Sequence, residues 1–187
     1  MATRLLTAIA ATFAASVLAG CGDSKSGSAA PVAAVAADGA GKDWAIDACK
    51  TFPVAAAAKA SGLAVESATL GAQVSVGGTN ASSCSYSTAG NRETFGILLR
   101  HDTTGNSTLE KQLASVTGMP AETGPSEMVA MPRGKAVWQP QLRSLSYLPD
   151  DDRMIVVTPP FIGLSMQGTD PAKMKDAAIR IATAAGA

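Results

Sequence analysis

Apolar and polar residues alternate along three segments in the first half of the chain, as expected for strands that bury one face. The alternation is clearest where Phe95, Ile97 and Leu99 share one face of an extended segment. Gly77-Gly78 lies between the first two segments and is typical of a hairpin turn. The pattern predicts strands at residues 63–76, 84–87 and 93–101.

A second group of three strands is predicted in the other half of the chain. Pro140 ends the first of them, and Asp150-Asp151-Asp152 is typical of a turn between the other two. Pro159-Pro160 should stop the pairing of the last strand, because proline has no backbone N–H to donate. The predicted segments are residues 135–138, 143–148 and 154–158.

Helical signals precede, separate and follow these strands. Pro53 suits the first turn of a helix, and Gly62 suits its left-handed end. Asp170-Pro171 has the composition of a helix start, and an earlier helical turn could use Asp43 as its cap. The predicted helices cover residues 43–49, 51–61, 109–116 and 171 onward.

Hairpin-linked strands with interspersed helices point to an antiparallel sheet covered on one face. We therefore expect an α+β fold in the order α-βββ-α-βββ-α, with a sheet of about five or six strands packed against helices. Residues 42–187 have the common length of one domain, so a single α+β domain is expected there.

The first 20 residues are organised like a secretory signal. Arg4 precedes an apolar run from Leu5 to Leu18, which is shorter than the roughly 20 residues that span a bilayer. Leu18-Ala19-Gly20-Cys21 then resembles the lipobox of bacterial lipoproteins. In that family the signal is cut before the cysteine, which carries diacylglycerol and usually a further acyl chain such as palmitate. The resemblance implies lipidation of Cys21. We favour a lipoprotein over a plain secreted protein and over a protein with an uncleaved membrane helix.

The same resemblance implies a place in the cell envelope, with the lipid anchor as the contact to the membrane. In Gram-negative lipoproteins an aspartate directly after the cysteine favours retention in the inner membrane. Gly22 holds that position here, which favours the periplasmic face of the outer membrane if the host is Gram-negative. Residues 21–41 are rich in Ala, Gly and Ser and are expected to form a flexible tether.

The charge balance excludes nucleic acid from the expected partners. The chain has 15 Lys and Arg against 15 Asp and Glu, and loss of Arg4 with the signal leaves 14 basic residues. A nearly neutral chain without basic runs has no electrostatic footprint for nucleic acid or for an anionic membrane surface.

Cys49 and Cys84 remain once Cys21 carries lipid. In the oxidising compartment that an exported chain reaches, such a pair most simply forms one disulfide. The alternative is a redox or metal site, which lacks a CxxC spacing and a neighbouring histidine. No metal or cofactor is therefore expected.

Three local motifs carry a second resemblance. They are Ala48-Cys49 before a helix that ends at Gly62, the strand Cys84-Ser85-Tyr86, and the later strand Gly134-Lys135-Ala136-Val137-Trp138. Together they resemble small bacterial envelope lipoproteins of largely unassigned function, over nearly all of the mature domain. The resemblance implies the disulfide and the fold, and very little chemistry.

Few residues are candidates for chemistry. His101, the one histidine, could act as a general base oriented by Asp102, but no Gly-x-Ser-x-Gly segment supplies a nucleophile, and a structural role is favoured. Asp150, Asp151 and Asp152 could attract calcium, but consecutive acids point in different directions and lack EF-hand spacing. A solvated hairpin tip is the favoured interpretation.

The apolar run after Pro159 is the candidate interaction patch. Phe161, Ile162, Leu164 and Met166 would form an exposed hydrophobic surface if the segment is a loop. Their alternation favours a buried strand instead. The larger aromatic residues Trp44, Tyr86, Trp138 and Tyr147 could line a pocket, although core packing is the default expectation.

These features favour a non-catalytic envelope lipoprotein. Its tethered domain would bind or scaffold an envelope protein, or a cell-wall or membrane component. The alternatives are an envelope hydrolase that uses His101 and a carrier that holds an apolar ligand between the sheet and the helices.

Overall fold

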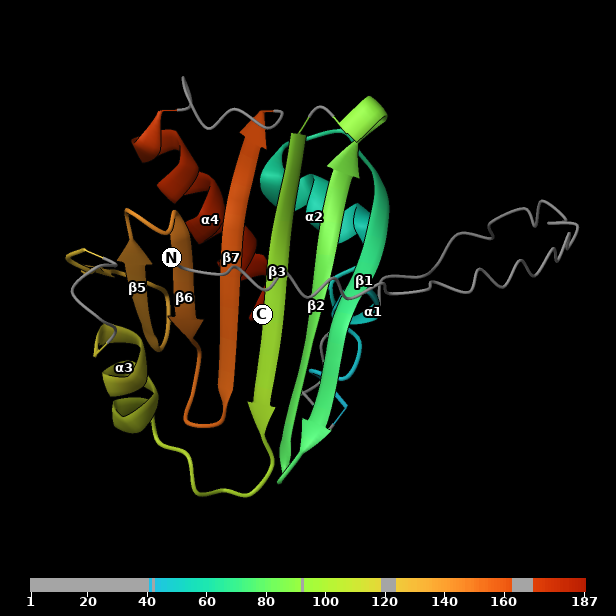
Figure 1. The fold of residues 1–187 in the computed structure, drawn as a ribbon. Coiled ribbons are helices and arrows are strands. Elements are labelled where there is room, and N and C mark those ends of the chain that lie inside the picture. Colours follow the sequence, from blue (N-terminus) through green and yellow to red (C-terminus); the bar gives the residue numbers. More distant parts are fainter. Residues whose placement is uncertain (1–40, 42, 92, 119–123, 163–169) are drawn as a thin grey trace, which may run out of the picture. The chain divides into compact units, whose positions relative to one another are not determined.

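An antiparallel sheet forms the centre of the computed structural model, which describes residues 41, 43–91, 93–118, 124–162 and 170–187. Its strand order over these residues is β1-β2-β3-β7-β6-β5-β4 (Figure 1). The strands are β1 (Val65–Val76), β2 (Thr79–Thr88), β3 (Glu93–Asp102), β4 (Glu127–Val129), β5 (Lys135–Gln139), β6 (Ser144–Leu148) and β7 (Arg153–Ile162). The predicted α+β class is confirmed, with seven strands in place of five or six.

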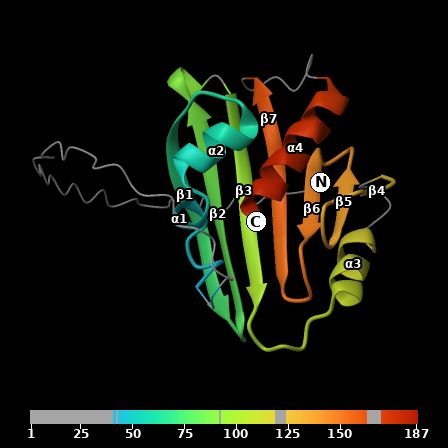
Figure 2. The same cartoon turned by 180° about the vertical axis from the view of Figure 1, so that it is seen from behind.

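Three of the described α-helices lie on one face of this sheet. Figure 2 shows α2 and α4 in front of the strands, where α2 contacts β1 and α4 contacts β6 and β7. The short α1 contacts β1, β2 and β3. The helices are α1 (Ala48–Thr51), α2 (Val54–Ser61), α3 (Leu109–Thr117) and α4 (Pro171–Ala185), with a 3-10 turn η1 (Ala89–Asn91) between β2 and β3. In the described part of the chain, no helix combines the length and apolar content needed to cross a membrane.

The helix ends follow the sequence signals closely. Gly62 ends α2 in the left-handed conformation with φ +75°, and the Thr108 hydroxyl accepts from Lys111 N at the start of α3. The Asp170 carboxylate likewise accepts from Ala172 N at the start of α4. The first helix differs from expectation, because its cap is Asp47, which accepts from Lys50 N, and not Asp43.

The core lies between the helices and the sheet. Tyr86 stacks on Phe95 with ring centroids 4.8 Å apart and meets the edge of Phe52 at 5.9 Å. The buried Tyr86 hydroxyl donates to the carbonyl of Phe52, and burial raises the pKa of this tyrosine. Trp138 and Tyr147 are also buried, while Trp44 packs partly buried against the core. Side chains therefore fill this space, which gives the apolar-carrier hypothesis no support.

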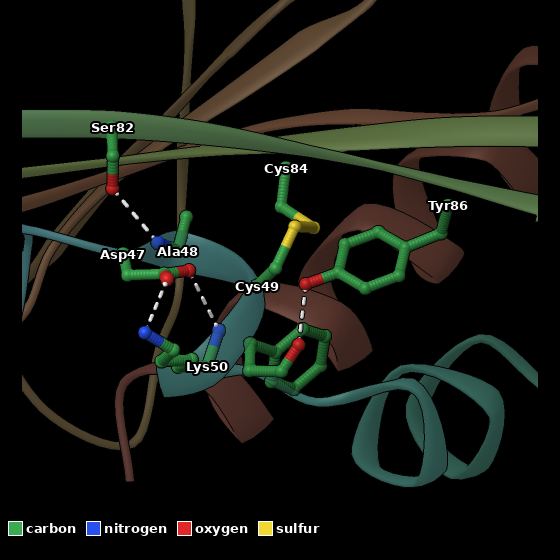
Figure 3. The surroundings of a disulfide bond; sticks show 8 residues. Asp47, Ala48, Cys49, Lys50, Ser82, Cys84 and Tyr86 are labelled. Carbon is green, nitrogen blue, oxygen red and sulfur yellow. Dashed lines mark hydrogen bonds and ion pairs between the residues drawn. A yellow bond between two sulfur atoms is a disulfide. The ribbon is translucent and has the colours of Figure 1, made fainter. Parts of the chain in front are cut away.

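A disulfide joins α1 to the middle of β2 (Figure 3). It links Cys49 to Cys84 with a Cα–Cα distance of 5.2 Å, and it closes a loop with a sequence separation of 35 residues. Beside it, Ala48 N donates to the buried Ser82 hydroxyl at 2.8 Å. The expected disulfide is thus present and fixes the first helical turn against the sheet.

The remaining helix, α3, lies on the other face of the sheet, over β5 and β6. Side chains alternate along β5, so Val137 and Gln139 point away from the core that holds Trp138. Gln139 Nε2 donates to the carbonyl of Val116 in α3. Gln112 of α3 in turn donates to the carbonyl of Asp151 at 2.6 Å. This end of the second face is therefore buried by α3.

The prediction that Pro159-Pro160 ends the last strand is wrong. β7 continues to Ile162, with Phe161 opposite Thr94 and a register irregularity opposite the two prolines. The pairs between β6 and β7 extend only from residue 155 to residue 157 of β7, so the prolines have a strand neighbour on one side alone. Prolines are tolerated at such irregular, singly paired positions, where no ladder hydrogen bond is lost.

Candidate functional site

The face of the sheet opposite α2 and α4 carries no described helix over β1, β2, β3 and β7, as the view in Figure 1 shows. We call this surface the open face. Leu98 of β3 lies at its centre, between Ser83 on β2 and Val156 on β7. Its side chain is 37% exposed although β3 is an inner strand of the sheet. An exposed leucine at the centre of a sheet marks a surface that no part of the described fold covers.

Small hydroxyl side chains surround Leu98 on the open face. Residues that pair across antiparallel strands share a face, which places the members of this group together. Gly96 lies among them, between Ser85 and Thr158, and adds no side chain of its own. The surface is consequently low and rich in hydrogen-bonding groups. The hydroxyl residues are Ser67 and Thr69 on β1, Ser83, Ser85 and Ser87 on β2, Thr94 on β3 and Thr158 on β7.

An apolar row crosses the open face next to Leu98. Val74 on β1 pairs with Ala81 on β2, and Met154 on β7 pairs with Arg100 on β3. Ala81 also pairs with Arg100, so one cation lies within an otherwise neutral row. A surface that combines apolar side chains with hydroxyls and carries little charge has the composition of a protein-binding patch, whose centre is poor in charge.

A shallow hollow of about 240 Å³ lies at the free edge of β1. It is lined by Ile46, Gln73, Val74 and Ser75. Gln73 Nε2 donates to the carbonyl of Ile46 at 2.7 Å and so fixes the loop before α1 against the edge strand. This hollow is apart from the core, beside a strand whose outer edge no described strand pairs.

His101 lies at the end of β3 and is only 6% exposed. Its Nε2 atom is 3.4 Å from the Asp152 carboxylate, and its Nδ1 atom is buried without a hydrogen-bond partner among the described residues. The expected partner Asp102 instead accepts from the backbone and hydroxyl of Thr104, which lowers the pKa of Asp102. Neighbouring residues of a strand point to opposite faces, so His101 and Asp102 cannot work together.

Each of the three acidic residues before β7 has its own partner, but Asp150 and Asp152 do not diverge as expected, because their carboxyl groups lie close enough to interact. Asp150 pairs with Arg153, because two guanidinium nitrogens of Arg153 donate to one carboxylate oxygen of Asp150, and this guanidinium lies 5.4 Å from the centre of the Trp44 ring. Asp151 accepts from Leu109 N at 2.9 Å and caps α3. Asp152 faces His101. The expected solvated hairpin tip is thus a junction that ties together the β6–β7 turn, α3 and the loop before α1.

Burial and neighbouring charges push the pKa values of two of these acids apart. Burial raises the pKa of Asp152, and the nearby Asp150 carboxylate raises it further. Burial also acts on Asp150, but the hydrogen bonds and charge of Arg153 outweigh it, and the pKa of Asp150 is lowered. The pair therefore tends to hold a proton on Asp152 rather than on Asp150.

The other expected site residues fall partly outside the described structure. Cys21 lies outside the described residues, and so do Leu164 and Met166 of the apolar run. Phe161 and Ile162 belong to the end of β7, and their side chains are not described. The choice between a buried strand and an exposed patch therefore stays a prediction for these side chains. The open face was missed, because its hydroxyl residues are scattered over four strands and carry no sequence motif.

No protein-family model, curated protein or solved structure matches the chain. What the domain does must therefore be inferred from its own residues and geometry.

Proposed function

We propose that the protein is a lipid-anchored envelope protein whose domain is a non-catalytic binding module, and that its open face receives an envelope protein. The observation that carries this proposal is the exposure of Leu98 in the middle of the sheet. A hydrolase built on His101 would need this histidine beside a nucleophile, whereas the buried His101 faces the Asp152 carboxylate in a structural junction. The resemblance to a lipobox supports the anchor, which would tether the domain to a membrane.

A protein partner fits this face better than a carbohydrate or a nucleic acid does. The described side chains of the open face include Leu98, Val74, Val156 and Met154 together with hydroxyl groups, and their one cation is Arg100. A protein surface can bury the apolar centre and bond the hydroxyls around it. A single cation provides no track for a phosphate backbone, and the described aromatic side chains are in or against the core, where sugar rings cannot stack on them.

Quantitative co-purification with a charged variant tests this proposal. Leu98→Asp places a carboxylate at the centre of the open face, and Leu142→Asp is a matched control because Leu142 is similarly exposed, at 45%, outside that face. We expect a partner that co-purifies with the wild-type and Leu142→Asp proteins and falls at least about tenfold with Leu98→Asp. Equal recovery with all three proteins would remove the open face from the proposal.

A further inference from the structure

The outer edge of β1 is the longest unpaired strand edge of the described sheet. β1 has 12 residues and is the first strand in the sheet order, so one side of its backbone has no described strand beside it. Unpaired N–H and C=O groups along such an edge are a template for a further strand. Binding by strand addition obtains its affinity from these main-chain hydrogen bonds.

The opposite edge of the sheet shows what a protected edge looks like in this protein. β4 has three residues, and its first residue, Glu127, forms an ion pair with Lys175 of α4. Short length and charge are the usual means of preventing strand addition. β1 has neither protection, since residues 67–76 contain no charged side chain and no proline. β1 has two irregularities in its pairing with β2, one between Val65 and Ser67 and a bulge between Leu70 and Gln73.

Exposed apolar side chains flank this edge on both faces of the sheet. Val74 and Val76 lie on the open face, opposite Ala81 and Thr79, and Val76 is 67% exposed. Leu70, opposite the buried Cys84, lies on the helix-covered face and is 38% exposed. The hollow beside Gln73 and Ile46 begins three positions after Leu70 along the strand and is large enough to receive an apolar side chain.

We propose that the occupant of this edge is β1 of a second copy of the chain, so that two sheets join through antiparallel β1 strands. The edge suits an extended, uncharged segment that carries some apolar side chains on each face, and β1 has these properties between residues 67 and 76, with Leu70 on one face and Val74 and Val76 on the other. Self-pairing brings no like charges together between residues 67 and 76. A two-fold axis would also give each copy the same contacts, as in most homodimers.

The bulge restricts the registers that this pairing can take. Gly71 and Ala72 both lie opposite Ser83, so the alternation of faces shifts by one residue across them. We place the two-fold axis in the bulge, between Gly71 and Ala72, because this register pairs residues that share a face. Thr69 of one copy then lies opposite Val74 of the other on the open face. Leu70 lies opposite Gln73 on the helix-covered face, where it fills the hollow. Each copy receives the other's Leu70 in this way.

Disulfide trapping of the full-length protein in whole cells tests the pairing. Two differently tagged chains, one with Thr69→Cys and one with Val74→Cys, should form a mixed crosslinked dimer on mild oxidation. The control pair Met128→Cys and Leu142→Cys, at exposed positions away from β1, should not. The crosslink is scored in total cell extract, so the result does not depend on the lipid anchor or on an open-face partner.

A charged variant separates self-pairing from chance collision. Leu70→Asp in both tagged chains removes an apolar contact from each copy and adds two carboxylates near the axis, so the crosslinked fraction should fall at least about tenfold. Leu142→Asp in the same chains should leave it unchanged. The Cys49–Cys84 disulfide, checked by thiol labelling, reports that the variant has folded. The proposal would be overturned if the Thr69→Cys and Val74→Cys chains fold but form no mixed dimer when Leu70 is unchanged. Crosslinking of β1 to a different protein would also overturn it.

Discussion

The backbone N–H of Ala48 donates to the hydroxyl of Ser82, one residue from Cys49 and two from Cys84. This hydrogen bond and the disulfide fix α1 on the helix-covered face of β2 at two adjacent points. Ser83, the next residue, points to the open face opposite Leu98. Neighbouring residues of β2, Ser82 and Ser83, thus point to the helix-covered face and to the open face of the sheet.

Replacing Ser82 by Ala should lower the free energy of unfolding by about 1 to 3 kcal/mol, because the N–H of Ala48 would be buried without an acceptor. Ser83→Ala is the matched control and should change stability by less than about 0.5 kcal/mol, since the side chain lies on a surface. Urea denaturation of both variants, with Cys21→Ala to avoid the lipid, measures the difference. Equal losses would contradict the division of β2 into two faces.

Replacing Cys49 and Cys84 together by Ala should cost about 3 to 4 kcal/mol of stability in the chain-entropy model, because the disulfide closes a loop of sequence separation 35. Adding reductant should lower the stability of the wild type toward that of the double variant and leave the variant itself unchanged. Denaturation curves with and without reductant test this. If thiol labelling shows that the disulfide of the wild type is fully reduced and its stability is nevertheless unchanged, the disulfide does not stabilise the fold.

The acid pair near His101 predicts an unusual pH dependence. Burial and the neighbouring Asp150 raise the pKa of Asp152 in the folded protein above its ordinary 3.8. Stability from this carboxyl is therefore fully present below pH 3.8 and is lost as the pH rises through the folded pKa. The stability of the wild type relative to Asp152→Asn should fall over that window. In an Asp150→Asn background, the same comparison should show a weaker dependence, and an unchanged one would contradict the assigned cause.

Lipidation predicts a change in cell fraction. Wild-type protein should sediment with membranes and incorporate a labelled palmitate analogue, whereas Cys21→Ala should do neither, because acyl chains supply about 0.8 kcal/mol of membrane affinity for each buried methylene. Detergent should release the wild type from the membrane fraction. Membrane association of Cys21→Ala at the wild-type level would mean that something other than the acylated cysteine holds the protein.

Sequence signals located most elements, because caps and turns depend on a few local residues. Gly62, Thr108 and Asp170 act where their residue types predict. β4 was missed, since three residues offer no periodicity and the strand depends on pairing with β5. The continuation of β7 through Pro159 was missed because the prolines are accommodated by the register of a distant strand, β3.

The candidate site was less predictable than the fold. His101 and Asp152 meet only when the β6–β7 turn reaches the end of β3, a contact between residues 51 positions apart that no local motif encodes. Leu98 was expected on a strand, but its exposure depends on which face the helices cover. That choice follows from packing over the whole domain, where α1, α2 and α4 all lie on the side of Tyr86.

Binding of a partner at the open face around Leu98 is tested most directly by a photo-crosslinking amino acid at position 98 of the full-length protein, irradiated in intact cells. Position 142 is the matched exposed control. We expect a discrete adduct with one envelope protein from position 98, absent from position 142 and lost when Thr158→Asp is added on the open face. Adducts of the same kind from both positions, or from neither, would contradict binding at the open face.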